Sequence, residues 1–300
     1  METALNEITL VLFTTIAPAG VVGYLTMAAA IIAARDEARA TALGRWLVVP
    51  LVLAITGLIA SATHLGTPAN ALYVLTGVGR SPLSNEVVAA VAFLALGGVY
   101  WIVSFRDDLT RAFRVAWLLP TCAAGLVFVG FISVAYSVPS IPTWSLPTAP
   151  VTLWLNALAS GPLVGLFGMA LAKQPAGKRA AAVLLVIAGC AAVANAVVLA
   201  NEWSALDGIA TTTARAAELV PPFALVAGAF LGCEALGIAA CALASLRDAL
   251  PTPGARDPFA AVRRMRTVRL VLAGAGVTAA LAGCFAVRFC FYMMRMTVGI

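Results

Sequence analysis

The chain has 300 residues, of which 62% are hydrophobic and only 11% charged, compared with about a quarter charged in ordinary soluble domains. This composition excludes a soluble globular domain, because a packed soluble core needs a polar exterior. The net charge of +6 does not indicate nucleic-acid binding, since arginine and lysine lie in short runs between apolar blocks, as topology determinants of membrane proteins do.

Apolar blocks of roughly 20 residues, long enough to cross a hydrocarbon layer about 30 Å thick, recur along the chain. Unpaired backbone groups are not tolerated in lipid, and the alternating pattern of barrel strands is absent, so each block is predicted to be a helix. In chain order the predicted spans are 8–34, 46–65, 87–105, 115–138, 151–171, 180–200, 219–246 and 268–291. We therefore expect an all-α polytopic membrane protein with eight transmembrane helices, forming a single domain over residues 1–300.

The distribution of basic residues predicts the orientation of these spans. The first, third, fifth and seventh loops hold 15 of the 19 lysine and arginine residues, and short basic loops stay on the cytoplasmic side. The four others are Arg80, Arg215, Arg288 and Arg295. Both termini are therefore expected to lie outside the cytoplasm.

The first span is expected to remain in the mature protein. It is preceded by acidic residues rather than a basic segment, and it is too long for the apolar part of a signal peptide. All predicted connections are short, and the longest ones, 139–150, 207–218 and 247–267, have room only for a turn or a short helix. Function is therefore expected within the bundle or on its surface.

The cysteines and the single histidine argue against a metal cofactor in this chain. The six cysteines are scattered through apolar spans without ligand spacing, which favours a packing role over iron–sulfur ligation. One histidine cannot supply the paired ligands of a dihaem anchor or a multi-histidine zinc site. We expect no haem and no metal here, so any electrons would come from a diffusible carrier and leave to another subunit.

His64 ends the second predicted span, where the helix pattern stops at Gly66-Thr67-Pro68. The charge distribution places it on the outer side. One interpretation is a helix-terminal side chain bound to free carbonyl groups, and the other is a proton-handling role, because an imidazole titrates near neutral pH.

The far end of the same outer loop reads Ser84-Asn85-Glu86. Ser84 or Asn85 can cap the third span, and Glu86 would favour the positive end of that helix. Spacing alone favours this structural interpretation. However, both ends of one outer loop then carry titratable groups beside a bundle, and such groups at membrane depth are functional candidates.

Two further charged residues fall within predicted spans. Arg288 could extend to the interface or face inward to balance Glu86. Glu234 has apolar flanks near mid-bilayer, which leaves two interpretations open: a proton path and an interhelical hydrogen bond. Glu202 and Trp203, at the end of the sixth span, are expected to be interfacial and structural.

Several motifs occur together in a recognisable order: Thr63-His64-Leu65-Gly66-Thr67-Pro68, Leu83-Ser84-Asn85-Glu86, Ile141-Pro142-Thr143-Trp144, Phe291-Tyr292 and Met296-Thr297-Val298-Gly299. With these motifs the sequence resembles the membrane anchor of dimethyl sulfoxide reductase, DmsC type, over nearly its whole length. The resemblance implies a haem-free, eight-helix anchor in the bacterial cytoplasmic membrane. It would oxidise menaquinol in anaerobic respiration, and its partners would be a four-cluster iron–sulfur subunit and a molybdenum bis-pterin catalytic subunit.

The resemblance also assigns roles to individual residues. His64 matches the quinol-site histidine of the family, Glu86 matches the acidic residue after Ser84-Asn85, and Arg288 matches the arginine before Phe-Tyr. Relatives often carry Gly-Glu in the last helix where this sequence has Gly283-Cys284, so no proton role is carried over to that position. The terminal acceptor, dimethyl sulfoxide or another, stays open.

Quinol oxidation needs a partner for the ring hydroxyl, a proton outlet and a nearby electron acceptor. We expect His64 to bind one quinol oxygen, Glu86 to relay protons outward and Arg288 to tune both by its charge. The alternative function is a proton-coupled transporter or channel in which Glu234, Glu86 and His64 line the path. Transporters often contain internal repeats with broken helices, and no convincing repeat is visible in this sequence.

Overall fold

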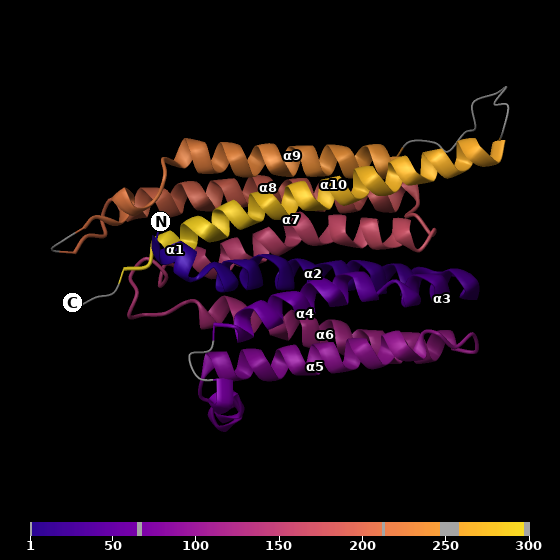
Figure 1. Cartoon of the computed structure of the whole chain (residues 1–300), viewed down its shortest axis with the longest axis horizontal. Coiled ribbons are helices and arrows are strands. Elements are labelled where there is room, and N and C mark those ends of the chain that lie inside the picture. Colours follow the sequence, from indigo (N-terminus) through magenta and orange to yellow (C-terminus); the bar gives the residue numbers. More distant parts are fainter. Residues whose placement is uncertain (1, 65–67, 212–213, 247–257, 297–300) are drawn as a thin grey trace.

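A computed structural model describes residues 2–64, 68–211, 214–246 and 258–296. Within these ranges the chain is helical, with one isolated bridge between Ala210 and Arg215 as its only extended pairing. The long helices run side by side along one axis (Figure 1). The elements are α1 (Glu2–Asn6), α2 (Ile8–Ala33), α3 (Glu37–Arg45), α4 (Val48–Ala62), η1 (Pro68–Gly77), α5 (Pro82–Val103), α6 (Arg111–Ala135), α7 (Thr148–Leu171), α8 (Lys178–Leu206), η2 (Ala216–Leu219), α9 (Phe223–Leu246) and α10 (Pro258–Met293).

Eight stretches in the described part of the chain are long and apolar enough to cross a membrane, with α3 and α4 together counting as one. This confirms the predicted all-α polytopic fold. Successive spans alternate in direction, so α1 and the last turn of α10 lie at the same end (Figure 1). We call this the termini end, and we call the opposite end, which carries Arg35, Arg45, Arg106 and Lys173, the basic end.

Several helix ends differ from the predicted spans. α5 begins at Pro82 rather than 87, because proline fits the first turn of a helix. α10 begins ten residues before the predicted span, since the basic segment from Arg263 to Arg269 continues the helix beyond the apolar block. The predicted loop 247–267 therefore contains helix from Pro258, and its 247–257 part lies outside the described residues.

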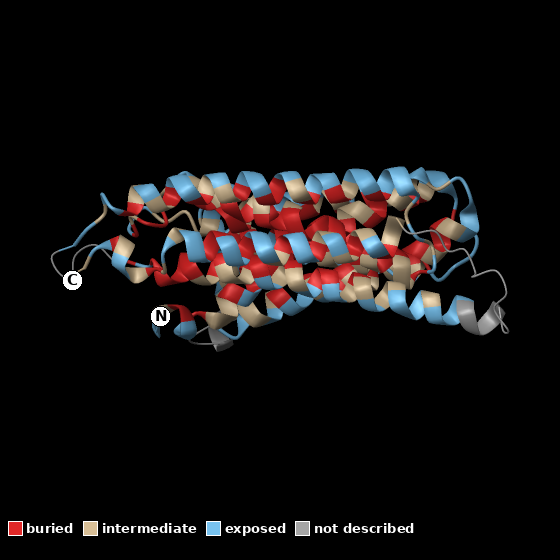
Figure 2. Cartoon of the chain, turned by 90° about the horizontal axis from the view of Figure 1, so that it is seen from above, coloured by how far each residue is buried: buried red, intermediate tan, exposed pale blue. Residues whose placement is uncertain are grey.

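The centre of the bundle is formed by α2 and α7, the two most buried spans. Buried residues fill the interior and exposed apolar residues face outward (Figure 2), as expected for helices surrounded by lipid. Gly161 and Gly165 of α7 allow α2 to pack closely. A Cβ at Gly161 would lie 2.4 Å from Cβ of Val22, and one at Gly165 would lie 2.4 Å from Cγ2 of Thr26. Small residues at such spacing are typical of membrane helix pairs.

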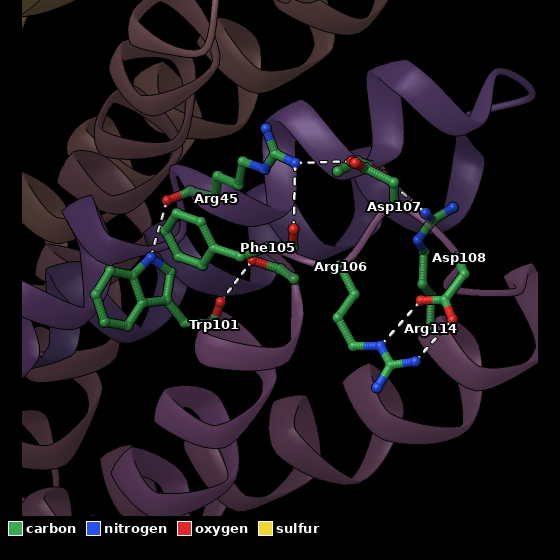
Figure 3. Close-up of polar contacts among 9 residues, drawn as sticks. Arg45, Trp101, Phe105, Arg106, Asp107, Asp108 and Arg114 are labelled. Atoms are coloured by element: carbon green, nitrogen blue, oxygen red, sulfur yellow. Dashed lines mark hydrogen bonds and ion pairs between the residues drawn. The ribbon is translucent and has the colours of Figure 1, made fainter.

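Ion pairs organise part of the basic end (Figure 3). Arg45 contacts Asp107 at 2.8 Å, and Arg106 contacts Asp108 at 2.7 Å. The hydrogen bond from Arg106 holds the pKa of Asp108 below its usual range. Arg114 is buried against α3, where it pairs with Glu37 and donates a hydrogen bond to Thr41. Arg45 and Arg114 therefore join segments that are distant in the sequence, whereas the Arg106 pair lies within the loop between α5 and α6.

Candidate functional site

His64 lies just beyond the end of α4, at the termini end of the bundle. Its backbone N–H donates to the carbonyl of Ser61. The imidazole faces a carboxylate, with Nε2 3.1 Å from Oε2 of Glu7, and 44% of the side chain is exposed. Among the described residues, the imidazole makes no hydrogen bond to a helix carbonyl, which was the structural interpretation of His64.

Glu7 holds the centre of this contact. It lies at the junction of α1 and α2 and is only 7% exposed. Its second oxygen, Oε1, accepts a hydrogen bond of 2.5 Å from Nη1 of Arg295, beyond the end of α10. We call Glu7, His64 and Arg295 the Glu7 clasp. One carboxylate thus links segments that follow α1, α4 and α10.

Sequence reasoning did not select Glu7, because it was considered only as part of the acidic N-terminus. The signal that could have identified it was its position. Glu7 immediately precedes the first apolar span, on the side predicted to hold the lone histidine and Arg295.

Ser84 and Asn85 do not cap the third span, contrary to the sequence-based expectation. The N-cap of α5 is Ser81, without a side-chain hydrogen bond, so Ser84 and Asn85 lie inside the first turn. Asn85 instead closes the preceding loop, since its Oδ1 accepts a hydrogen bond of 2.7 Å from the backbone N–H of Gly79. Ser84 is buried close to Gly77 at the end of η1. Both residues therefore fix the loop that leads from η1 to α5.

Glu86 directly follows Asn85 and is the fifth residue of α5, just beyond the first turn in which the sequence-based expectation placed it. Its side chain is 1% exposed, and Oε2 has no hydrogen-bond partner among the described residues. A buried carboxyl without a partner is costly unless it has a function or an unseen partner. The burial and the start of α5 at Pro82 do not fit the capping interpretation, and the functional interpretation stays a prediction.

Arg288 faces the interior, not the interface. It is 1% exposed, and its Nε donates a 3.1 Å hydrogen bond to Oγ1 of Thr14. Its guanidinium carbon lies 4.2 Å from the centroid of the Phe291 ring, within the range of a cation–π contact. No ion pair to Glu86 occurs among the described residues. Arg288 is therefore held by a hydroxyl and an aromatic face.

Tyr136 connects the surroundings of Glu86 and Arg288. It follows α6 and is close enough to both side chains to interact electrostatically. Its ring packs against that of Tyr292, with centroids 5.9 Å apart. Burial raises the pKa of the Tyr136 phenol well above its usual range, so the group stays protonated and can donate a hydrogen bond.

Glu202 is buried within the protein, at 1% exposure. It lies within electrostatic range of Arg288. Trp203 is half-buried, and its Nε1 donates a 3.1 Å hydrogen bond to the carbonyl of Pro221. The last turns of α8 therefore add a carboxyl to the polar interior near the termini end.

The Pro142-Thr143-Trp144 motif fastens the end of α10. Thr143 donates a 2.6 Å hydrogen bond to the carbonyl of Met294, and Nε1 of Trp144 donates a 2.9 Å bond to the carbonyl of Phe291. The Trp144 and Phe291 rings are stacked with centroids 5.0 Å apart. This contact positions the turn of α10 that carries Arg288 and the segment that carries Arg295.

Glu234 lies in the middle of α9 and is buried in a polar cluster between helices. Its Oε1 is 3.3 Å from Sγ of Cys284, and that sulfur is 3.5 Å from the carbonyl oxygen of Asn156. Asn195 donates a 2.7 Å hydrogen bond to the side chain of Asn156. These contacts support the interhelical hydrogen-bond interpretation of Glu234, and they give Cys284 a definite partner.

The structure thus gathers part of the predicted site. Within the described ranges, no hydrogen bond or ion pair joins His64 to Ser84, Asn85, Glu86 or Arg288. Residues 65–67 of the first motif and 297–299 of the last motif lie outside the described residues. In the part of the chain that the structure describes, no group of three or more histidine, cysteine or acidic side chains could hold a metal ion.

The fold and the polar groups define a class: a multi-pass membrane protein with ionisable side chains buried near one end of its bundle. The protein belongs to the DMSO reductase anchor subunit (DmsC) family, which it matches over residues 1–293. This confirms the resemblance seen in the sequence motifs. The protein is a membrane anchor subunit of the DMSO reductase type.

Three relatives illustrate the match. The protein is 29% identical to the YnfH chain of anaerobic dimethyl sulfoxide reductase from Escherichia coli strain K12 over 296 residues, which are 98% of this sequence and 96% of the relative. It is 32% identical to the anaerobic dimethyl sulfoxide reductase C subunit of the same strain over 230 residues, which are 74% and 78% of the two sequences. The corresponding C subunit from Haemophilus influenzae is 30% identical over 161 residues, covering 54% and 58%.

Proposed function

We propose that this anchor binds and oxidises menaquinol at the termini end and passes the electrons to an iron–sulfur subunit docked there. A molybdenum bis-pterin catalytic subunit would then reduce the terminal acceptor. Family membership supports the anchor role. The observation that carries the proposed site is the Glu7 clasp, in which a buried carboxylate faces a half-exposed imidazole.

The orientation of the imidazole suits it to accept a proton from a quinol hydroxyl. Nε2 of His64 faces Glu7, so Nδ1 is left for a ligand. A carboxylate beside one ring nitrogen stabilises the cation that forms when the imidazole takes a proton. In this proposal His64 is the base, and Glu7 positions it.

The buried groups toward the termini end would move protons away from the quinol. Glu86 is a carboxyl without a partner at Oε2 among the described residues, and Tyr136 lies within electrostatic range of both Glu86 and Arg288. Glu86 would relay the protons, and Arg288 would favour its ionised form by charge. Ser84 and Asn85 would keep Glu86 in place by closing the loop before α5.

The site would lie on the outer face of the bacterial cytoplasmic membrane. The loops predicted to be cytoplasmic hold 15 of the 19 basic residues, and several of these residues mark the basic end in the structure. The termini end is then the outer end. Quinol oxidation there would deliver both electrons and protons on the outer side.

The test compares His64→Ala and Glu86→Gln in the assembled complex, with Glu218→Gln as a control. Glu218 is an exposed acid of η2, so the control removes the same charge as Glu86→Gln outside the buried cluster. We expect His64→Ala to weaken binding of a quinol-analogue inhibitor about tenfold or more, the effect of losing an interaction of about 1.4 kcal/mol. Glu86→Gln should mainly slow menaquinol oxidation. Unchanged inhibitor affinity and oxidation rate in both variants would remove both residues from the site.

A further inference from the structure

A cavity lies at the basic end, at the opposite end of the bundle from the Glu7 clasp. It is bounded by the end of α2, the start of α8 and part of α7, and its volume is 660 Å³. This falls within the range of about 300–1,000 Å³ that is typical of ligand sites. We call it the α2–α8 cavity.

The walls of this cavity are apolar. Ala30 and Ala33 of α2, Met169 of α7, and Ala180 and Val183 of α8 contribute to its lining. Val183 is 58% exposed in a membrane-spanning helix, so this wall is open to lipid. The hydroxyl of Thr26, which also lines the cavity, donates back to the carbonyl of Val22 at 2.9 Å. Because the Thr26 hydroxyl already donates this hydrogen bond, it offers no free donor to the cavity. The wall is therefore apolar enough to contact an acyl chain.

Three arginines form the rim. Arg35 follows α2, Arg39 belongs to α3, and Arg179 belongs to the first turn of α8. Nη2 of Arg39 donates a 3.1 Å hydrogen bond to the carbonyl of Pro175, which anchors that side chain beside the cavity. No ion pair between these three arginines and a carboxylate occurs within the described ranges.

The acids nearest in sequence are engaged elsewhere. Asp36 accepts hydrogen bonds from the backbone N–H groups of Ala38 and Arg39, and so caps α3. Glu37 pairs with Arg114. Elsewhere at this end Arg45, Arg106 and Arg114 do have carboxylate partners. Among the described residues, none of the three rim arginines forms an ion pair with an acidic side chain.

We propose that the α2–α8 cavity binds an anionic glycerophospholipid, with its phosphodiester at Arg35, Arg39 and Arg179 and an acyl chain along the α2 and α8 walls. Guanidinium groups form strong charge-assisted hydrogen bonds to phosphate oxygens. Basic pockets between membrane helices favour acidic head groups for this reason. The apolar walls at membrane depth distinguish a lipid from a free phosphate ion. The proposal is independent of the quinol site.

The test uses the assembled complex after delipidation by extended detergent washing. Its thermal unfolding midpoint is measured with added phosphatidylglycerol, phosphatidylcholine or inorganic phosphate. We expect a rise of several degrees with phosphatidylglycerol, because a ligand bound only to the folded state stabilises that state. Phosphatidylcholine and phosphate should give little or no shift. An equal shift with phosphatidylcholine, or a full shift with phosphate alone, would overturn the proposal.

Two pairs of variants locate the effect. Arg35→Gln with Arg179→Gln should remove the phosphatidylglycerol shift, whereas Arg111→Gln with Arg263→Gln should retain it, because those arginines do not line the cavity.

Ala33→Trp should fill the cavity without changing any charge and also remove the shift. Ala112→Trp, at an exposed position of α6 near the same end, is its control. A full shift in both cavity variants would refute the site. If either cavity variant fails to fold, the lipid that copurifies with the washed wild-type complex is measured instead. Enrichment of phosphatidylglycerol over the bulk membrane supports the site, and no enrichment overturns it.

Discussion

The Glu7 carboxylate contacts side chains that lie far apart in the sequence, and Arg295 is 288 positions away from it. This buried carboxylate both holds the side chains of His64 and Arg295 in position and balances positive charge on them. Its loss would leave the imidazole without a fixed orientation and Arg295 without a partner. The quinol site proposed above therefore depends on a residue that does not need to touch the quinol.

We expect Glu7→Gln to lower menaquinol oxidation about tenfold, since breaking a charge-assisted contact costs about 1–3 kcal/mol and 1.4 kcal/mol is tenfold in rate. The control is Glu2→Gln, which removes the same charge from an exposed position in the first turn of α1. The measurement is the steady-state oxidation rate of the assembled complex. Equal rates in the two variants would show that Glu7 does not position His64.

Cys284 offers a second prediction for a single residue. In Cys284→Ala, Oε1 of Glu234 loses its nearest described partner, and a small void replaces the sulfur. We expect this variant to lower the free energy of unfolding by about 1–3 kcal/mol and Cys284→Ser to retain most of the stability. Cys190→Ala, at an exposed position, should change the thermal unfolding midpoint little. A loss as large in Cys190→Ala would contradict a specific role for the buried thiol.

Individual site residues were only partly predictable from the sequence. His64, Glu86, Arg288 and Glu234 stood out because charged or titratable groups are rare in apolar spans. Their partners did not stand out, since the contacts depend on how distant helices pack. Glu86 illustrates the difference: its spacing favoured a capping role, and only the position of the helix start showed it to be buried beyond the first turn.

Close packing between helices sets the geometry of the bundle. At the contact between α2 and α4, a Cβ at Gly20 would lie 2.7 Å from the carbonyl oxygen of Pro50 and 2.8 Å from the backbone nitrogen of Ala54. Backbone atoms cannot rotate away as a side chain can. The position of α4, and hence of His64 beyond its end, therefore depends on this glycine.

We expect Gly20→Ala to lower the free energy of unfolding by about 1–3 kcal/mol, as overpacking generally does. Gly98→Ala is the control, because a Cβ there meets nothing within 4 Å and alanine favours a helix by about 0.5–1 kcal/mol over glycine. Thermal unfolding in detergent measures both variants. Similar losses at the two positions would show that the α2–α4 contact tolerates separation.

Hydropathy predicted the spans well because apolar length is a local property of the sequence. It did not predict η1, which lies in a loop, or the extension of α10 through a basic segment. It placed the second span at 46–65, which matches α4 (Val48–Ala62), but it did not predict the short helix α3 (Glu37–Arg45) that directly precedes this span. Hydrogen bonds and tertiary contacts decide where such helices begin and end, and a count of apolar residues gives no information about these contacts.

Buried polar groups occur toward both ends of the bundle and lie among apolar residues, with Arg114 at the basic end and Arg288 toward the termini end. The polar cluster around Glu234, together with Arg288 and the Glu7 clasp, extends from mid-bundle to the termini end. Toward the basic end, α7 to α10 are packed through an apolar core that includes Leu163, Leu185 and Val277. No continuous polar route through the described part of the bundle is apparent from these contacts.

We therefore expect proteoliposomes that contain this protein alone to show no proton flux above that of protein-free vesicles. A pH-sensitive dye inside the vesicles measures the flux after an acid pulse. Potassium and valinomycin are present, so that potassium movement balances the charge carried by protons. Flux that Glu234→Gln abolishes would instead support the transporter or channel alternative. Glu218→Gln serves as the control for loss of an acidic side chain.

The orientation gives the last prediction. Alkaline phosphatase fused after Ile300 should be active in cells, and a green fluorescent protein fused there should be dark, if the C-terminus lies outside the cytoplasm. Fusions in the loop between α6 and α7, which lies at the termini end, should behave in the same way. The opposite pattern at both sites would reverse the assignment of the two membrane faces.

The Glu7 clasp also imposes an order on biosynthesis. Its carboxylate emerges from the ribosome well before its guanidinium partner, which lies 288 positions later in the sequence. A prematurely terminated polypeptide could insert most of its spans and still lack the arginine that neutralises Glu7. Synthesis beyond Arg295 is thus a condition for the fully paired clasp, and a shorter nascent chain would not present a finished quinol site to its partners.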